Sequence, residues 1–167
     1  MDTPPPQLSV DDIRRRLRAH APRIIEPSGK RAAVAAVLHD GNAGSELLFI
    51  ERAERPHDPW SGHMAFPGGR VDPGDASVRH AAEREHREEV GLDLASAELL
   101  GRLDDIEGAP PGFDSLVVSA FVYRLDRRAA PTPNDEVREV LWVPTAHLQE
   151  RDRRVPFYWP REQREMH

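Results

Sequence analysis

The chain has 167 residues, of which 38% are hydrophobic and 31% are charged, and its formal net charge is −6. This length and composition are typical of one globular domain with its own core, and the acidic balance argues against nonspecific nucleic-acid binding. The absence of cysteine excludes disulfides, thiolate metal sites and a cysteine nucleophile. Because no apolar run approaches membrane-spanning length and the N-terminus lacks the features of a signal peptide, we expect a cytoplasmic protein with no membrane partner.

The chain begins with a proline-rich stretch, and we expect residues 1–8 to form a disordered N-terminal tail before a single domain over residues 9–167. The first predicted element of this domain is a helix over residues 10–20. Ser9 can cap its first turn together with Asp12, because a serine followed by an acidic residue three positions later satisfies free N–H groups. The apolar stripe of this helix consists of Val10, Ile13 and Leu17.

Most of the remaining apolar runs are short and bounded by turn residues, which is typical of strands. The expected strands cover residues 31–40, 46–53, 97–108, 115–125 and 136–144. A loop over residues 55–69 ends in a further short strand, and a short helix is expected at residues 145–150. Because strands outnumber helices and their order is mixed, the pattern predicts an α+β fold.

A second long helix is predicted over residues 76–90, with Asp75 as its N-terminal cap and Gly91 at its end. At about 100° per residue, one side of this helix should face the core. That side begins with small apolar residues, at Val78, Ala81 and Ala82. One turn later it continues as a stripe of carboxylates, with Glu85 and Glu89 in the same sector and Glu88 at its edge.

Two interpretations of the carboxylate stripe are open. Runs of charge on helices are usually solvated surface, and the pairs Glu83–Arg87 and Arg84–Glu88 have the spacing of surface ion pairs. Carboxylates on the side facing the core, however, lose hydration at a large cost unless another group compensates their charge. A hard divalent cation such as Mg²⁺ would do so, because it prefers oxygen ligands. His86 lies beside the apolar side and is either a packed core residue or a catalytic one.

The segment ending in "REHREEVGL" resembles the Nudix box, G-x5-E-x7-R-E-U-x-E-E-x-G-U, where U is an aliphatic residue. The matching residues are Arg84, Glu85, Glu88, Glu89, Gly91 and Leu92. The motif "FPGG" stands just upstream. The spacing from Gly69 to the arginine of the box is one residue longer than in the general pattern. Ala76 occupies the early Glu position beside Asp75, and His86 replaces an aliphatic residue.

The changed spacing and the aspartate before the helix are similar to the coenzyme A diphosphatase branch of Nudix enzymes. This branch also has an upstream signature, L-L-T-x-R-S-x-x-L-R-x-H-x-G-x-x-x-F-P-G-G. Residues 48–53 and 62–69 are similar to the two ends of this signature. Its middle differs, because Asp58 and Trp60 stand where the signature has Arg and His, and the spacing is one residue longer.

The resemblance implies an α/β/α sandwich with a mixed sheet and a catalytic helix. It also implies metal-dependent hydrolysis of the diphosphate bond in a nucleoside diphosphate derivative, with Mg²⁺ or Mn²⁺ as cofactor. The expected substrate is coenzyme A or its thioesters, and the expected products are 3′,5′-ADP and 4′-phosphopantetheine. Alternative substrates are ADP-ribose, dinucleoside polyphosphates and nucleoside triphosphates. A nonenzymatic nucleotide sensor is a further alternative.

The resemblance also implies roles for individual residues. The expected metal ligands are Gly69, Glu85, Glu88 and Glu89. Arg84 and Glu85 are the expected catalytic residues, with Arg84 orienting Glu88. The general base is left open between Glu85 and a loop carboxylate such as Glu107 or Glu136.

Substrate recognition must come from residues outside the helix. Arg52 and Arg70 are candidates for binding phosphate, although each could equally form a surface ion pair. Trp60 and Phe113 are candidates for stacking on an adenine, and Trp60 could instead be a buried loop anchor. A homodimer is expected from the family resemblance alone. The apolar segment "VPFYW" near the C-terminus is expected to pack either on the core or on a partner subunit.

Overall fold

A mixed β-sheet forms the centre of the structure, which is a computed structural model describing residues 8–27, 29–41, 44–56, 58, 60–108, 115–153 and 156. Its strands are β1 (Lys30–Gly41), β2 (Gly44–Arg52), β3 (Met64–Ala65), β4 (Gly68–Arg70), β5 (Glu98–Arg102), β6 (Ile106–Gly108), β7 (Leu116–Leu125) and β8 (Val137–Pro144). The helices are α1 (Val10–Ala19), α2 (Val78–Val90) and α3 (Thr145–Gln149), with 3-10 turns at Leu94–Ser96 and Arg151–Arg153.

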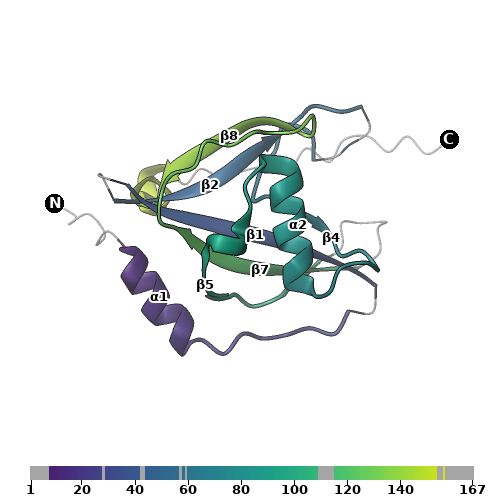
Figure 1. The fold of residues 1–167 in the computed structure, drawn as a ribbon, viewed down its shortest axis with the longest axis horizontal. Coiled ribbons are helices and arrows are strands. Elements are labelled where there is room, and N and C mark those ends of the chain that lie inside the picture. The colour runs from purple at the N-terminus through teal and green to yellow at the C-terminus, as the bar shows by residue number, and fades with distance from the viewer. Residues whose placement is uncertain are drawn as a thin grey trace.

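Strand β1 organises the sheet because it pairs with β2, β4 and β7. It runs parallel to β7, from Lys30 opposite Leu116 to His39 opposite Leu125. The C-terminal end of β1 pairs with β2, whereas its N-terminal part pairs with β4. The two strands of the β1–β2 hairpin therefore diverge (Figure 1). The β3–β4 segment lies between them, since β3 is bonded to β2 and β4 to β1.

Two hydrophobic clusters lie on opposite faces of this sheet, because alternate residues of a strand point to opposite sides. On one face, β1 packs against α2 through Ala33, Ala35 and Val37, which meet Ala81 and Ala82. On the other face, Ala36 and Leu38 pack with Val10 of α1. Helices thus cover both faces of a mixed sheet, and the predicted α+β sandwich is confirmed.

The first predicted helix is confirmed, and it begins where the sequence places its cap. The Ser9 hydroxyl accepts a hydrogen bond from the Asp12 N–H at 3.1 Å, and the Asp12 carboxylate accepts one from the Ser9 N–H at 3.3 Å. These reciprocal bonds satisfy N–H groups that the first turn cannot pair internally. The helix ends at Ala19, next to the predicted limit.

The predicted strand over residues 97–108 is wrong in one respect, because it forms two separate strands, β5 and β6. Between them lies Asp105, which is completely buried. Its carboxylate accepts hydrogen bonds from the Ile25 N–H at 2.9 Å and from the Arg102 guanidinium at 2.6 Å. A buried carboxylate requires such partners. The strand is therefore interrupted where Asp105 turns toward the segment that precedes β1.

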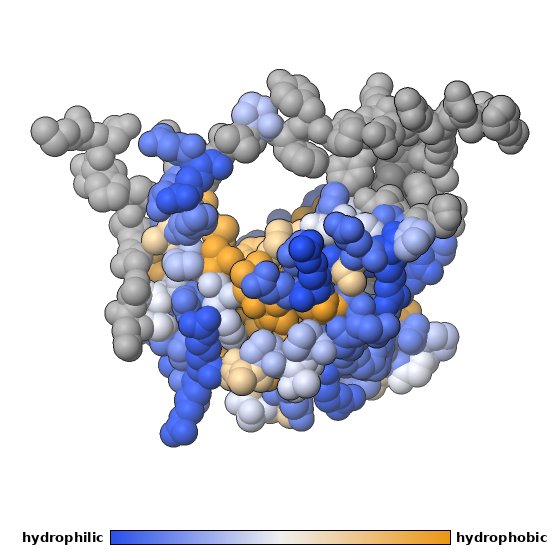
Figure 2. Space-filling view, turned by 90° about the horizontal axis from the view of Figure 1, so that it is seen from above, coloured by the Kyte–Doolittle hydropathy of each residue, from blue (hydrophilic) through white to orange (hydrophobic). Residues whose placement is uncertain are grey.

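Hydrophilic side chains cover much of the face seen in Figure 2, and an apolar area is exposed near its centre. None of the described helices is long and apolar enough to cross a membrane. Residues 1–7 of the predicted tail and nearly all of the "VPFYW" segment lie outside the described residues. The predicted domain limits and the predicted homodimer stay predictions.

The approach of β4 to β1 leaves no room for a side chain at Gly68. A Cβ atom there would lie 2.3 Å from the carbonyl oxygen of Ala33 and 2.6 Å from the Cα atom of Val34. We expect Gly68→Ala to lower the free energy of unfolding by about 2 kcal/mol or more, because packed backbone would have to shift. Urea denaturation measures this loss.

The control is Gly74→Ala, because no atom of the described residues lies within 4 Å of the Cβ position at Gly74. Equal stability of the two variants would contradict the packing argument.

Candidate active site

Helix α2 starts later than the sequence suggests. The Ser77 hydroxyl accepts a hydrogen bond from the His80 N–H at 3.1 Å, so Ser77 is the cap and the prediction of Asp75 in this role is wrong. The predicted end is confirmed, because Gly91 adopts the left-handed conformation with φ of 73°. A Cβ atom at Gly91 would also lie 2.8 Å from the carbonyl oxygen of Thr132, so two separate constraints favour glycine there.

Asp75 instead binds the guanidinium of Arg84. The Nε and Nη2 atoms of Arg84 donate to the two carboxylate oxygens of Asp75, each at 3.0 Å, and the Asp75 side chain is only 2% exposed. The hydrogen bond from Arg84 holds the pKa of Asp75 at about 2. The carboxylate acceptors in turn raise the pKa of Arg84. This bidentate pair attaches the loop before α2 to the middle of the helix.

The same guanidinium also reaches two carboxylates of the predicted stripe. Its Nη1 atom donates to Glu85 at 2.9 Å and to Glu88 at 3.1 Å, and its Nη2 atom donates to the Arg70 carbonyl at 3.1 Å. The predicted Arg84–Glu88 contact is therefore confirmed. Glu83 pairs differently from the prediction, since it accepts from the Tyr123 hydroxyl at 2.8 Å and faces Arg79 at 3.3 Å.

Glu89 is the buried member of the stripe. It is 3% exposed, and its carboxylate accepts a hydrogen bond from the Gly68 N–H at 2.8 Å. Burial raises the pKa of Glu89 to about 7, because this one N–H and the more distant Arg52 only partly compensate the lost hydration. The predicted continuation of the core-facing side into carboxylates is confirmed at this position.

Glu85 lies directly against Gly69. A Cβ atom on Gly69 would be 2.4 Å from a carboxylate oxygen of Glu85, so the second glycine of "FPGG" makes room for this side chain. Partial burial raises the pKa of Glu85, although Arg84 opposes the shift. The two glycines thus have different functions: Gly68 permits the contact between strands, and Gly69 accommodates the carboxylate.

Within the described residues, no three acidic, histidine or cysteine side chains converge on a single point as a formed metal site. In this conformation Glu85 and Glu88 face Arg84, and Glu89 faces Gly68. The donor set nevertheless fits a hard cation, because it consists of carboxylates on neighbouring turns of one helix. A cation would also compensate the buried charge of Glu89. The predicted ligand role of Gly69 stays a prediction.

A loop formed by residues 132–136 is bound to the end of α2 and to the end of β2. The Thr132 N–H donates to the Val90 carbonyl at 2.8 Å, and the Asn134 N–H donates to the Glu89 carbonyl at 3.1 Å. From the other side, the Ala53 N–H donates to the Glu136 carbonyl at 2.8 Å. These bonds fix the backbone of Glu136 relative to the helix that carries the stripe.

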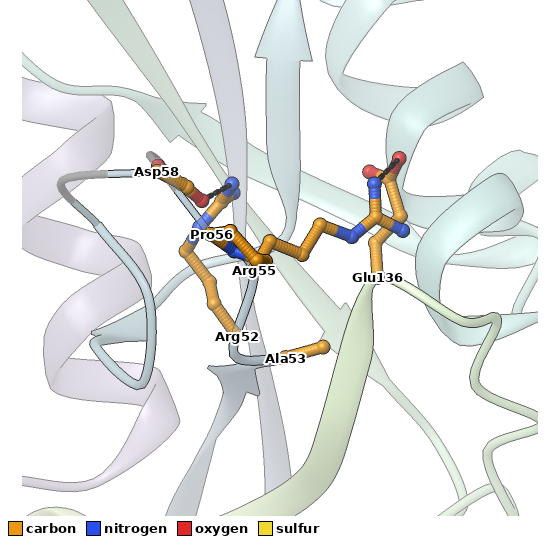
Figure 3. Close-up of a pocket in the computed structure, with 6 residues that line it drawn as sticks. All are labelled: Arg52, Ala53, Arg55, Pro56, Asp58 and Glu136. Atoms are coloured by element: carbon orange, nitrogen blue, oxygen red, sulfur yellow. Dashed lines mark hydrogen bonds and ion pairs between the residues drawn. The ribbon is translucent and has the colours of Figure 1, made fainter.

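Arg52 lies at the end of β2, and its Nη2 atom is 3.0 Å from Asp58 (Figure 3). The Trp60 N–H and Arg52 both donate to Asp58 and hold its pKa below the usual range. Trp60 is 46% exposed, so it is not a buried loop anchor. Arg70 is exposed at the end of β4. Phe113 lies outside the described residues.

His86 is completely buried, which agrees with a packed core residue. Its Nδ1 atom lies 3.0 Å from the Leu92 carbonyl, and burial lowers its pKa, so the neutral ring donates from this nitrogen. The Nε2 atom is buried and meets no hydrogen-bond partner in the part of the chain that the structure describes.

The geometry of α2 and its flanking glycines agrees with a comparison against known families, in which the model of the NUDIX domain matches residues 29–162. The chain belongs to the Nudix domain family. The resemblance predicted from the sequence is therefore confirmed. We refer below to α2 as the Nudix helix.

Relatives of this Nudix chain include the human mitochondrial coenzyme A diphosphatase NUDT8, with 35% identity over 80% of the chain and 56% of the relative. The mouse peroxisomal coenzyme A diphosphatase NUDT7 is 34% identical over 81% of the chain and 56% of the relative. The chain thus spans slightly more than half the length of these proteins.

Solved structures share the fold at lower identity. A Nudix hydrolase from Alicyclobacillus acidocaldarius has a TM-score of 0.61 and 19% identity, over 74% of this chain and 82% of that chain. The Caenorhabditis elegans Ap4A hydrolase, in a binary complex, has a TM-score of 0.60 and 18% identity, over 72% of this chain and 83% of that one. These similarities support the Nudix fold alone.

Sequence reasoning missed the partner of Arg84 and the loop that faces the Nudix helix. The partnership of Asp75 with Arg84 had one signal in the sequence: Ala76 replaces the early Glu of the Nudix box, and an acidic residue, Asp75, stands next to it. No local signal indicates the position of the 132–136 loop, since its bonds to Val90 and Glu89 join segments that are distant in the sequence.

The buried pair between Asp75 and the Nudix helix should contribute to stability in a pH-dependent way. The folded pKa of Asp75, about 2, lies below the ordinary value near 3.9 for an unfolded chain. Its contribution is therefore fully present above about pH 4 and is lost as the pH falls toward 2. We expect Asp75→Asn to cost about 1–2 kcal/mol of unfolding free energy at pH 7 and progressively less below pH 4.

Denaturation measured from pH 7 to pH 2.5 tests this expectation. Asp126→Asn is the matched control, because Asp126 pairs with Arg124 at 2.7 Å but is 84% exposed. A cost for Asp75→Asn that does not change with pH would contradict the assignment.

Proposed function

We propose that this Nudix chain hydrolyses the diphosphate bond of coenzyme A or its thioesters in a metal-dependent reaction, giving 3′,5′-ADP and 4′-phosphopantetheine. The observation that carries the proposal is the arrangement of Glu85, Glu88 and the buried Glu89 around Arg84 and Gly68. The coenzyme A substrate is supported by the names of the relatives at 34–35% identity. The predicted cytoplasmic location and the absence of a nucleic-acid partner stay predictions.

The three carboxylates of Glu85, Glu88 and Glu89 would hold Mg²⁺ or Mn²⁺. Both ions bind oxygen ligands. The chemistry that such an ion supplies when bound is neutralisation of phosphate charge and a lowered pKa of water. Arg84 keeps the carboxylates of Glu85 and Glu88 on one side of the helix, which reduces their repulsion and limits their rotation.

We propose Glu136 as the general base that accepts the proton of the attacking water. Its backbone is bound to the Nudix helix through the 132–136 loop, and its charge contributes to the raised pKa of Glu89, after the larger effect of burial. Glu107 is exposed on β6 and accepts a hydrogen bond from the Ser115 hydroxyl at 2.7 Å. Glu85 accepts a hydrogen bond from Arg84 at 2.9 Å, which is a closer contact than the 3.4 Å between Glu136 and Arg55. These contacts favour Glu136 among the three carboxylates considered from the sequence.

Trp60 and the two arginines at positions 52 and 70 are proposed to contact the substrate. The partly exposed indole of Trp60 offers an apolar surface for an adenine, and its ring meets His63 edge-on at 5.9 Å between centroids. Arg52 lies at the end of β2, where the next residue, Ala53, donates to the Glu136 carbonyl of the loop bound to the Nudix helix. Arg70 follows the glycine that contacts Glu85.

The first test is product-resolved hydrolysis with and without Mg²⁺ or Mn²⁺. The substrates are coenzyme A, an acyl-coenzyme A, ADP-ribose, a diadenosine polyphosphate and a nucleoside triphosphate. We expect preferential metal-dependent cleavage of coenzyme A to 3′,5′-ADP and 4′-phosphopantetheine. A preference for another substrate would overturn the substrate assignment, and ligand binding without turnover of any substrate would favour a nucleotide sensor.

Glu88→Gln and Glu89→Gln should each lower metal-dependent turnover by at least about 100-fold, because each removes an anionic ligand. Circular dichroism checks that both variants remain folded. Glu139→Gln serves as a control, because this residue is exposed on β8. Near-normal hydrolysis by both helix variants in the presence of Mg²⁺ would exclude the proposed ligands.

The choice of base predicts a difference between the variants of Glu136 and Glu107. Glu136→Gln should lower kcat by about 100-fold or more, in the range usual for general acid–base catalysis. Glu107→Gln should leave kcat close to that of the parent protein. The kcat values of both variants at saturating substrate and metal test the assignment, and the reverse order of effects would contradict it.

A further inference from the structure

A pocket of about 320 Å³ lies beside the proposed metal site, at the end of β2. It is lined by Arg52, Ala53, Arg55, Pro56, Asp58 and Glu136 (Figure 3). The pocket adjoins the Nudix helix, because Asn134, two residues before Glu136, donates to the Glu89 carbonyl at 3.1 Å. A ligand group in this pocket would therefore lie next to a diphosphate held at the Nudix helix, and the volume is sufficient for part of a nucleotide.

The two arginines of the pocket are held differently. Figure 3 shows their side chains pointing apart, Arg52 toward Asp58 and Arg55 toward Glu136. The Arg52–Asp58 pair is partly buried, with side-chain exposures of 31% and 20%, so it forms a fixed wall. Arg55 is 45% exposed, and its partners Asp135 and Glu136, at 3.1 and 3.4 Å, are 91% and 47% exposed.

The exposed ion pairs of Arg55 are easily exchanged for a stronger partner. Pairs of this kind contribute little to stability, because water competes for both charges. A phosphate dianion carries more charge than a carboxylate and accepts two parallel N–H bonds from one guanidinium. A phosphate entering the pocket can therefore replace the carboxylates of Asp135 and Glu136 at Arg55.

The backbone of Arg55 is already ordered for this role. Its N–H donates to the Ser61 hydroxyl at 2.9 Å, and the same hydroxyl donates to the Arg55 carbonyl at 2.8 Å. The Gly62 N–H closes the turn by donating to the Arg52 carbonyl at 3.2 Å. Little backbone entropy would be lost on binding, so exchange of partners requires only movement of the Arg55 side chain.

We propose that Arg55 and this pocket bind a phosphate monoester of the substrate that lies apart from the diphosphate that is cleaved. In coenzyme A this group is the 3′-phosphate of the ribose. The proposal rests on the proposed function for its substrate. Glu136, the proposed base, also lines the pocket, but binding of a phosphate at Arg55 can be measured without hydrolysis. Arg55 is thus a residue that determines specificity between nucleotides with and without the additional phosphate.

The test compares coenzyme A with dephospho-coenzyme A, which lacks only the 3′-phosphate. In Arg55→Ala, the ratio of kcat/KM for the two substrates should fall by at least tenfold, mainly through a higher KM for coenzyme A. Arg55→Lys should retain part of the preference. Arg138→Ala is the matched control, since Arg138 pairs with Glu51 at 2.9 Å, is 60% exposed and is not among the residues that line the pocket.

An equal loss on both substrates in Arg55→Ala, expressed in kcat, would overturn the proposal and show that Arg55 acts only through Glu136. No change in the ratio would also overturn it.

A binding measurement that needs no turnover separates this proposal from the proposed function. By calorimetry, 3′,5′-ADP should bind the parent protein at least tenfold more tightly than 5′-AMP, and Arg55→Ala should remove most of this difference. Equal affinities in the parent protein would exclude the pocket as a phosphate site, whatever the enzyme hydrolyses.

Discussion

The guanidinium of Arg84 is the group on which the arrangement of the site depends. Three carboxylates, those of Asp75, Glu85 and Glu88, surround it within hydrogen-bond distance. Without a central cation, carboxylates this close on a partly buried surface would repel one another and lose hydration with no compensation. The planar fork of arginine serves several acceptors at once, which the single ammonium of lysine cannot do with the same geometry. One side chain therefore connects the loop, the helix and the carboxylate stripe.

The second constraint comes from the sheet. Because β1 and β2 diverge, the β3–β4 segment can reach the interior, and its glycines can approach both β1 and the Nudix helix. This approach brings the Gly68 N–H to the buried carboxylate of Glu89. The charge of Glu89 is thus held by a backbone dipole in a place where a side chain would not fit. Gly68 therefore contributes both to the packing of the sheet and to the site.

The sequence allowed prediction of those features whose signals are local. The cap at Ser9, the end of the second helix at Gly91 and the core-facing carboxylates follow from spacing and residue type alone. The strand break at Asp105 and the partnership of Asp75 with Arg84 did not follow, because each depends on a partner brought near by the fold. The turn at Ser61 also did not follow from the sequence, since it is closed by bonds to Arg55 rather than by a turn motif. Burial of a charged group was therefore predictable, and the identity of its partner was not.

The attachment of the 132–136 loop to the Nudix helix has a consequence for how chains of this kind can vary in length. Residues 126–131, between β7 and the first anchor at Thr132, are mostly exposed and form no strand or helix. Insertions or deletions there would change the outline of the molecule while leaving Glu136 where it is. A single residue added between Thr132 and Glu136 would instead displace the carboxylate from the helix, because both ends of that short segment are bonded. Divergence in length is thus tolerated on one side of Thr132 and restricted on the other.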